Sequence, residues 1–399
     1  MKPNQVAKVT LAVPYFNYLN LMKFDKILSQ LERNKAIKEQ GGLTSIPPPF
    51  PRLAEYYGGF TKGSITCITS SSGTGKTKLT KFLTVLNIFK KTYNTNIKPK
   101  IFYFALEESE TDFWLSFISY FLYEKYKITV SISDLKSLGK FTMSSKLLEK
   151  VREAEKFISK LQEFVEVVDY IRNPTGIAKH VKSYFDNPEI GEHKYKESTD
   201  KFGNTKKYLS HYEYKSEDNW VFFILDHISL LSNETAPDTK MKLTSYQTFD
   251  FMIKDYILDV FSKRYKIANI IVHQQTPSSE KAVFSSRGNL IEEKLEPSLE
   301  ELHINKGVHQ DYEVVIGLFN PSRYDIPVHN GYDISLLGKT YRSLKILKDR
   351  HFGLENSSVG LFFNGANGEF EELPRPEEMV TNNYYEQLKN KIKTMKENE

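Results

Sequence analysis

Apolar residues along the chain fall into two patterns, short runs of strand length and positions spaced three or four residues apart. Runs that are apolar at almost every position are typical of parallel strands covered on both faces. The runs lie at residues 65–68, 101–106, 164–168, 221–225, 268–272, 313–319, 343–347 and 358–363. Segments with helical spacing separate most of them. This alternation predicts an α/β fold with a central, mostly parallel sheet flanked by helices.

The N-terminal segment, residues 1–48, contains one amphipathic helix at about residues 20–35. Its apolar stripe consists of Leu21, Phe24, Ile27, Leu28 and Leu31. A pair of glycines at 41–42 and three prolines at 47–49 separate this helix from the first strand. Two arrangements remain open: the helix folds back on its own domain, or it docks on a neighbouring subunit.

Three other segments depart from the alternation of strands and helices. Residues 186–219 are polar, charged and tyrosine-bearing with little periodicity, which predicts an insertion with mobile loops. Residues 321–339 predict a hairpin or a further insertion. The charged tail at 374–399 predicts a solvated helix.

Residues 64–79, SITCITSSSGTGKTKL, combine a strand, a loop of small residues and a helix. This order is typical of the phosphate-binding P-loop, whose backbone N–H groups and helix N-terminus hold a polyphosphate. We expect Lys76 to reach the β- and γ-phosphates and the Thr77 hydroxyl to bind Mg²⁺. The nucleotide-binding residues are Ser70, Ser71, Ser72, Gly73, Thr74, Gly75, Lys76, Thr77 and Lys78, with Ser70 where glycine is usual. The flanking strand and helix disfavour the alternative, a Ser/Gly turn with an exposed lysine.

Acidic residues directly follow two of the apolar runs. Glu107 follows residues 101–106, and we expect its strand to lie beside the P-loop strand, so that Glu107 enters the ligand crevice and orients the attacking water. Asp226 follows residues 221–225, at the position where a P-loop site holds the Mg²⁺ shell. Both residues are therefore candidates for nucleotide chemistry.

Two more groups of polar residues lie at strand ends. After residues 268–272 we favour Gln274 as the side chain that senses the γ-phosphate, and we leave His273 unassigned because a lone histidine is more often structural. Lys348 and Arg350 have two interpretations. They form a surface ion pair, which contributes little, or they neutralise a phosphoryl group held by a neighbouring subunit, as an arginine finger does.

Composition narrows the choice of partners and compartment. The chain has 399 residues and a net charge of +5, which permits a nucleic-acid partner without requiring one. Local charge matters more, and the long segment at 276–306 carries Lys281, Arg287, Lys294 and Lys306. Cys67 is the only cysteine, which excludes disulfides and cysteine-based zinc sites. Since no signal peptide or long apolar span is recognisable, we expect a soluble intracellular protein.

Taken in order, these motifs resemble the ATPase domain of replicative hexameric helicases of the DnaB type, within the RecA-like superfamily. The resemblance covers roughly residues 49–373. The family's lead-in and P-loop are similar to FPRLAEYYGGFTKGSITCITSSSGTGKT, its catalytic-glutamate motif to FYFALEE, its second nucleotide motif to LDHISLL and its glutamine motif to HQQ. Its DNA-binding loop, glutamine–aspartate pair and next strand are similar to EPSLEELHINKGVHQDYEVVIGLFNP, and its lysine-x-arginine signature to KDR.

The resemblance assigns roles to individual residues. It implies ATP and Mg²⁺ as cofactors, Glu107 as the catalytic glutamate, and Thr77 and Asp226 as metal-site residues. Lys76 and Gln274 act on the phosphates, while Lys348 and Arg350 complete a neighbour's site. Gln310 and Asp311 occupy the glutamine–aspartate pair. The implied DNA-binding residues are Lys281, Arg287, Lys306 and Gly307.

The resemblance also implies an organisation and a task. We expect an N-terminal helical segment at 1–48, a RecA-like ATPase domain at 49–373 and a charged tail at 374–399; the family's globular N-terminal domain has no room in residues 1–48. The implied function is a homo-oligomer, a hexameric ring, that moves on single-stranded DNA and unwinds duplex during replication. Primase or a helicase loader is an implied partner, and the bacterial cytoplasm or a phage-infected host cell the implied location.

Two other functions compete with the helicase interpretation. A RecA-like DNA-binding ATPase, acting in recombination or loading, forms filaments or rings without unwinding and uses the same head-to-tail contact. A structural ATPase without catalysis is disfavoured by the presence of Lys76, Thr77, Glu107 and Asp226.

Overall fold

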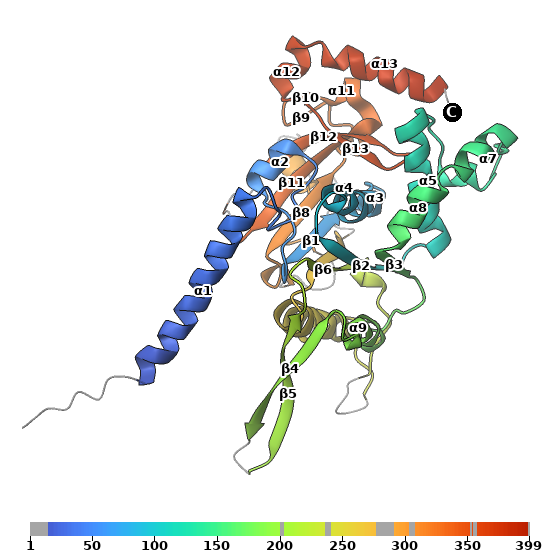
Figure 1. The fold of residues 1–399 in the computed structure, drawn as a ribbon. Helices are drawn as coiled ribbons and strands as arrows, with labels where there is room; N and C mark the ends of the chain where they lie inside the picture. Colours follow the sequence, from blue (N-terminus) through green and yellow to red (C-terminus); the bar gives the residue numbers. More distant parts are fainter. Residues whose placement is uncertain are drawn as a thin grey trace, which may run out of the picture. The chain divides into compact units, whose positions relative to one another are not determined.

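The structure, a computed structural model, describes residues 15–199, 203–235, 241–276, 291–302, 308–351, 353 and 357–397. It divides into two compact units, residues 1–45 and 46–399. Helix α1 (Tyr15–Glu39) belongs to the first unit, and the second is built around a nine-stranded sheet (Figure 1). Among the described residues, no helix combines the length and the apolarity needed to cross a bilayer.

Helix α1 presents an apolar face to solvent. The side chains of Phe24, Ile27, Leu28 and Leu31 are between 42% and 59% exposed. Burying a side chain of this size contributes roughly 1.5–3 kcal/mol of stabilisation. The stripe predicted from the sequence is therefore a surface that an additional contact would stabilise.

The sheet of the second unit runs in the order β13-β12-β11-β8-β1-β7-β6-β2-β3 (Figure 1). Neighbouring strands from β8 to β3 pair in parallel, and β11, β12 and β13 add antiparallel pairs at one edge. The strands are β1 (Ile65–Ser70), β2 (Lys98–Ala105), β3 (Val165–Val168), β6 (Asn219–Asp226), β7 (Ala268–Gln274), β8 (Val314–Phe319), β11 (Tyr341–Asp349), β12 (Ser358–Asn364) and β13 (Glu369–Glu372). The predicted α/β fold with a mostly parallel sheet is confirmed.

Both faces of the central strands are covered, which explains why their sequences are apolar without alternation. On one face Phe104 and Phe223 join a core cluster with residues of α9 (Pro174–Ser183), α10 (Ser245–Phe251) and the π-helical segment Met252–Arg264 that continues α10. On the other face the ring of Tyr103 lies 4.7 Å from that of Phe113 in α5 (Glu110–Tyr126). The sheet is thus the middle layer of a three-layer sandwich.

The remaining helices follow local start signals. Ser109 caps α5 and Ser131 caps α6 by accepting a hydrogen bond from a backbone N–H, while Pro376 occupies the first turn of α12. Their bounds are α2 (Pro51–Tyr56), α3 (Lys76–Lys81), a π-helical turn (Phe82–Leu86), α4 (Asn87–Thr92), α6 (Ile132–Leu135), α7 (Ser145–Arg152), α8 (Glu155–Gln162), α11 (Ile334–Leu337), α12 (Pro376–Thr381) and α13 (Tyr384–Glu397).

The expected position of the Glu107 strand was wrong. Strand β1, which enters the P-loop, lies between β7 and β8, and both β7 and β6 separate it from β2. Strand order is not readable from these segments, because every central strand is apolar on both faces and fits next to any other. Only the predicted neighbour of β2 was wrong. Strand β2 still ends on the same side of the sheet as β1, because the two strands run in the same direction.

The prediction of mobile loops at residues 186–219 was wrong for most of this segment. It contains a hairpin of β4 (Gly191–Thr199) and β5 (Thr205–Tyr214). The base of the hairpin is anchored because the Tyr214 hydroxyl donates to the Tyr265 carbonyl at 2.6 Å and Tyr212 is buried. The outer parts of both strands are exposed, which explains why the sequence there shows no hydrophobic periodicity.

The charged tail does not form a purely solvated helix. Met379 of α12 and Leu388 of α13 are buried in a cluster with Tyr332, Tyr341 and Phe362. Residues 321–339 contribute to the same cluster through a short hairpin of β9 (Val328–His329) and β10 (Tyr332–Asp333), as predicted, followed by α11. The few apolar residues of the tail thus cover the antiparallel edge of the sheet.

Candidate nucleotide-binding site

The P-loop connects β1 to α3 at the carboxyl edge of the parallel strands. Two residues of this loop have positive φ angles, Gly73 at +70° and Gly75 at +104°, a region that L side chains rarely adopt. A Cβ atom on Gly75 would also lie 3.0 Å from Cζ of Phe363. Ser70, the departure from the usual glycine, is fully buried and its hydroxyl donates to the Ser71 carbonyl at 2.9 Å. A small residue therefore suffices at that position.

A cavity of about 400 Å³ opens above the P-loop. We call it the site cavity. It is lined by Ser72, Gly73, Gly75, Lys76, Thr77, Lys78, Glu107, Gln274, Phe363 and Gly365. The structure thus brings together the predicted residues Lys76, Thr77, Glu107 and Gln274. Glu107 reaches this cavity, although β2 is not next to β1, because parallel strands end at a common edge.

The two adjacent glutamates after β2 have different environments. Glu108 is bound by the buried ammonium group of Lys81 at 2.6 Å, and Lys81 also lies 4.9 Å from the centre of the Phe113 ring. Glu107 lines the site cavity, and its side chain is 58% exposed. Of the two carboxylates, Glu107 is the one that is accessible to a ligand.

Asp226 lies at the end of β6 and is buried beside the P-loop. Thr77 Oγ1 donates to its Oδ1 at 3.4 Å, and the Tyr103 hydroxyl donates to its Oδ2 at 2.8 Å. Burial raises the pKa of Asp226 to about 6, although the Tyr103 hydrogen bond opposes this effect. The carboxylate is therefore held at a cost that a cation at this position would offset.

The donor set at Thr77 and Asp226 fits a magnesium ion. A hydroxyl and a carboxylate are the hard oxygen ligands that Mg²⁺ prefers, and Mg²⁺ commonly uses one or two protein ligands together with phosphate oxygens. In the part of the chain that the structure describes, no group of three or more His, Cys, Asp or Glu side chains could form a separate metal centre. A metal bound here would thus depend on the nucleotide as well as on the protein.

The polar residues after β7 separate into two groups. Gln275 is buried; its Nε2 donates to Thr69 Oγ1 at 2.9 Å and to the Ser298 carbonyl at 3.2 Å. His273 is fully buried and its ring contacts that of Phe249. Gln274 is the member that lines the site cavity. Its position agrees with the preference for Gln274 over His273.

Lys348 and Arg350 lie at the amino ends of the parallel strands, whereas the site cavity lies at their carboxyl ends. Lys348 pairs with Val315, and Val315 pairs with Cys67 near the start of β1. The Arg350 backbone N–H donates to the Glu313 carbonyl at 3.1 Å. Lys348 Nζ also donates to the His309 carbonyl, and the Arg350 guanidinium donates to the Gln310 carbonyl. The structure thus places these cations beside the predicted glutamine–aspartate pair and away from the chain's own P-loop.

Some predicted residues lie outside the described part of the chain. They are the four DNA-binding candidates Lys281, Arg287, Lys306 and Gly307.

Lys78, predicted to hold phosphate, lines the site cavity, and its ammonium group donates to the Gly365 carbonyl. Burial and the nearby Lys81 lower the pKa of Lys78 to about 8.

Two arginines near the P-loop were missed by sequence reasoning. Arg342 Nε donates to the Thr74 carbonyl, and Arg323 Nη1 donates to the Ser72 carbonyl, both at 2.6 Å. Each is a lone arginine in a segment without a motif, far from its partner in the sequence. Their contacts with the P-loop are visible only in the folded structure.

The fold of this chain is similar to that of solved protein structures. No protein-family model matches the chain, and no curated protein matches it. A solved structure described as an "ATPase Domain" matches with a TM-score of 0.58 and 15% identity over 88% of this chain and 98% of that chain. Another, "The Structure Of A DnaB-Like Replicative Helicase And Its Interactions With Primase", matches with a TM-score of 0.58 and 15% identity over 87% of this chain and 66% of that chain. The chain therefore has the RecA-like fold of a DnaB-type helicase ATPase domain.

The raised pKa of Asp226 predicts a pH-dependent stability. The folded protein takes up this proton more readily than the unfolded chain, so the free energy of unfolding falls as pH rises from about 4 to about 6. Asp226→Asn removes this fall. We expect the variant to gain on the order of 2 kcal/mol over the wild type between pH 4 and pH 8, measured by urea unfolding without nucleotide or Mg²⁺. Glu107→Gln, an exposed carboxylate of the same cavity, is the control, and an Asp226→Asn difference equal at both pH values would contradict the assignment.

Proposed function

We propose that this protein is an ATP-driven DNA helicase that moves along single-stranded DNA as a ring and unwinds duplex during DNA replication. The observation that carries the proposal is the site cavity, where Lys76, Thr77, Glu107 and Gln274 meet within the fold of a helicase ATPase domain. A P-loop alone would support nucleotide binding. The accessible carboxylate of Glu107 in the same cavity supports hydrolysis.

Each residue of the site cavity has a part in this reaction. Lys76 and the P-loop N–H groups bind the phosphates, and Glu107 orients the attacking water and accepts its proton. Gln274 contacts the γ-phosphate and links its presence to the segment that follows β7. Thr77 and Asp226 would hold Mg²⁺, which supplies charge neutralisation at the β- and γ-phosphate oxygens when it is bound.

The positions of Lys348 and Arg350 support a site shared between subunits. A P-loop hydrolase gains several orders of magnitude in rate from a cation that neutralises the transferring phosphoryl group. In this chain both cations lie at the far edge of the sheet from their own P-loop. Head-to-tail packing of identical chains would bring one subunit's far edge to the next subunit's cavity, and such packing forms a ring when the rotation between subunits closes.

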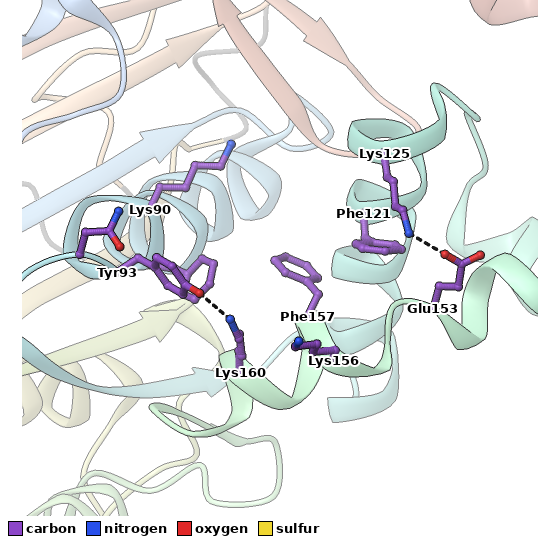
Figure 2. A pocket seen from close by; sticks show the side chains of 10 residues that line it. Lys90, Tyr93, Phe121, Lys125, Glu153, Lys156, Phe157 and Lys160 are labelled. Atoms are coloured by element: carbon purple, nitrogen blue, oxygen red, sulfur yellow. Dashed lines mark hydrogen bonds and ion pairs between the residues drawn. The ribbon is translucent and has the colours of Figure 1, made fainter.

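Helix α1 is proposed to hold the ring together by docking on a neighbouring subunit. A groove of about 590 Å³ lies on the second unit between α4, α5 and α8. We call it the aromatic groove. Its rings form a chain of contacts, with Phe89 next to Tyr93 and Phe157, and Phe157 stacked on Phe121 at 5.7 Å. Figure 2 shows Phe157 between Tyr93 and Phe121. These rings, which are partly buried except for the exposed Tyr93, suit the exposed stripe of α1 from a second copy.

Charges are complementary along one side of the proposed contact. Lys90, Lys125, Lys156 and Lys160 line the aromatic groove, and of its described lining residues only Glu153 is acidic (Figure 2). On α1 the residues Asp25, Glu32 and Glu39 follow one side of the stripe at seven-residue spacing. Opposite charges along the rim would fix the direction in which the helix lies.

Single-stranded DNA, and primase or a loader, are the proposed partners. We infer that Lys281, Arg287, Lys306 and the backbone of Gly307 contact DNA phosphates, so binding should be independent of sequence and weakened by salt. One of the similar structures is described by its interactions with primase. A protein with this task would work in the bacterial cytoplasm or in a phage-infected cell.

The proposal predicts DNA-stimulated ATP hydrolysis and strand separation. We expect the purified protein to hydrolyse ATP faster with single-stranded DNA and to unwind a forked duplex, both only with Mg²⁺. Lys76→Ala should lose nucleotide binding, and Glu107→Gln should keep binding and lose about 10²- to 10⁴-fold in turnover. A phosphate-release assay and a fluorescent fork measure these activities. Filaments with ATPase activity but no unwinding would support the recombination-type alternative instead.

A shared site predicts rescue between two inactive variants. Lys76→Ala and Arg350→Ala are each expected to be inactive in ATP hydrolysis. Mixed subunits should regain activity, up to roughly a quarter of the wild-type rate for random mixing in a closed ring, because an intact P-loop then meets intact cations. Mixing Lys76→Ala with Glu107→Gln is the control, since both changes affect the same face. Equal rates in the two mixtures would exclude a site completed by Arg350 of a neighbour.

The docking of α1 predicts a change in oligomeric state. Ile27→Asp combined with Leu31→Asp should shift the protein from rings to smaller species, because it places charge in the apolar contact. Ser29→Asp combined with Ala36→Asp adds the same charge to the exposed side of α1 opposite the stripe and should leave the rings intact. Mass photometry with ATP measures both. Unchanged rings in the first variant would show that α1 does not hold the subunits together.

A further inference from the structure

Two arginines from the late part of the chain bind backbone carbonyl groups of the P-loop. Arg342, in β11, donates from Nε to the Thr74 carbonyl at 2.6 Å. Arg323, just before β9, donates from Nη1 to the Ser72 carbonyl at 2.6 Å. The P-loop itself is formed by residues 70–78, so both contacts join segments far apart in the sequence.

Arg342 is fixed in place from several sides. It is 5% exposed and Nη1 also donates to the carbonyls of Lys339 at 2.9 Å and Tyr341 at 2.7 Å. Its guanidinium lies 4.6 Å from the centre of the Phe363 ring, and Phe363 in turn packs against Gly75. Burial lowers the pKa of Arg342 to about 10, so the group still carries its charge at neutral pH. The planar guanidinium has several donors in a rigid array, which holds the bonded carbonyls in defined directions.

Fixing a carbonyl also fixes the next N–H group. In a trans peptide the C=O of one residue and the N–H of the following residue lie in one plane and point in opposite directions. The Thr74 carbonyl shares its peptide with the Gly75 N–H, and the Ser72 carbonyl with the Gly73 N–H. Gly73 and Gly75 both line the site cavity. Each arginine therefore holds a peptide group whose N–H points away from that arginine and belongs to a glycine that lines the site cavity.

Because Gly73 and Gly75 are flexible, their peptide groups keep one orientation only when another group holds them. Gly73 and Gly75 have φ angles of +70° and +104°, and a glycine has few steric barriers to alternative angles. Rotation of either peptide would turn a carbonyl oxygen toward the cavity, where it would repel a phosphate. A bound carbonyl removes that alternative.

We propose that Arg342, assisted by Arg323, is a positioning residue of the chain's own P-loop, aiming the N–H groups of Gly75 and Gly73 at the polyphosphate. The inference rests on the proposed function, because it takes a nucleoside triphosphate as the ligand. It assigns Arg342 a different task from Lys348 and Arg350, which follow it along the chain. Arg342 acts on its own subunit, whereas those two cations act on the next one.

Nucleotide affinity in homogeneous variants is the first test. Arg342→Met is expected to weaken binding of N-methylanthraniloyl-ATP about tenfold and Arg323→Met about threefold, because an unrestrained peptide loses part of its oriented donors. Arg342→Lys keeps a cation and a donor and should recover part of the loss. Arg264→Met is the control, since Arg264 pairs with Asp259 at the end of the π-helical segment.

A thermal melt without nucleotide separates positioning from a purely structural role. Substitution of the exposed Arg323 should weaken affinity while the midpoint of unfolding stays within a few degrees of the wild type. If Arg342→Met and Arg323→Met bind the analogue as tightly as the wild type at a temperature where both are folded, the proposal is overturned.

Mixed assemblies then test on which subunit Arg342 acts. At an ATP concentration far below the Kd of Arg342→Met, where that variant alone is nearly inactive, its mixture with Arg350→Ala should regain at least the ATP hydrolysis of the Lys76→Ala and Arg350→Ala mixture, because the Arg342→Met subunit still offers intact cations. If only the Lys76→Ala and Arg350→Ala mixture regained activity, the assignment of Arg342 to the P-loop of its own subunit would be overturned. No rescue in either mixture would count against the shared site of the proposed function, and the affinities of the homogeneous variants would still decide the role of Arg342.

Discussion

The common edge of parallel strands is the constraint on which this site depends. Each parallel strand ends on the same side of the sheet, so residues that follow different strands meet without any local signal linking them. Asp226 ends β6 and Glu107 follows β2, yet both lie within reach of the helix that begins at Lys76. The position of a strand in the sheet matters less than its direction. This explains how Glu107 lines the site cavity even though two strands separate β2 from β1.

The reversed direction of β11 places its first and last residues at opposite ends of the parallel strands. Because β11 runs antiparallel to β8, its first residues lie near the P-loop and its last residues lie at the amino ends of the parallel strands. Arg342 at the beginning contacts the Thr74 carbonyl, while Lys348 at the end contacts the His309 carbonyl. A register shift between Ile346 and Lys348 changes which side chains face outward at that end. Under the proposed function, one strand would therefore serve two nucleotide sites when subunits pack head to tail.

Sequence reasoning succeeded where structure is local and failed where it depends on distant pairing. The P-loop could be predicted because strand, loop and helix are contiguous, and Asp226 could be placed because it directly ends an apolar run. Strand order could not be predicted, since uniformly apolar strands carry no information about their neighbours. The burial of Leu388 depends on a surface made by β10 to β12, and its own helix is otherwise mostly polar. Arg342 has no motif because its partner is a backbone carbonyl, which every residue possesses.

Charged groups of the site destabilise the folded protein when no ligand is bound. Burial raises the pKa of Asp226 to about 6, and burial together with the nearby Lys81 lowers the pKa of Lys78 to about 8. Both shifts mean that the charged form of the group is less favourable in the folded protein than in water. A cation beside Asp226 and a polyphosphate beside Lys78 would reverse both effects together. Ligand binding would then stabilise the fold through the same groups that destabilise it beforehand. Such opposed local preferences are expected at a functional site.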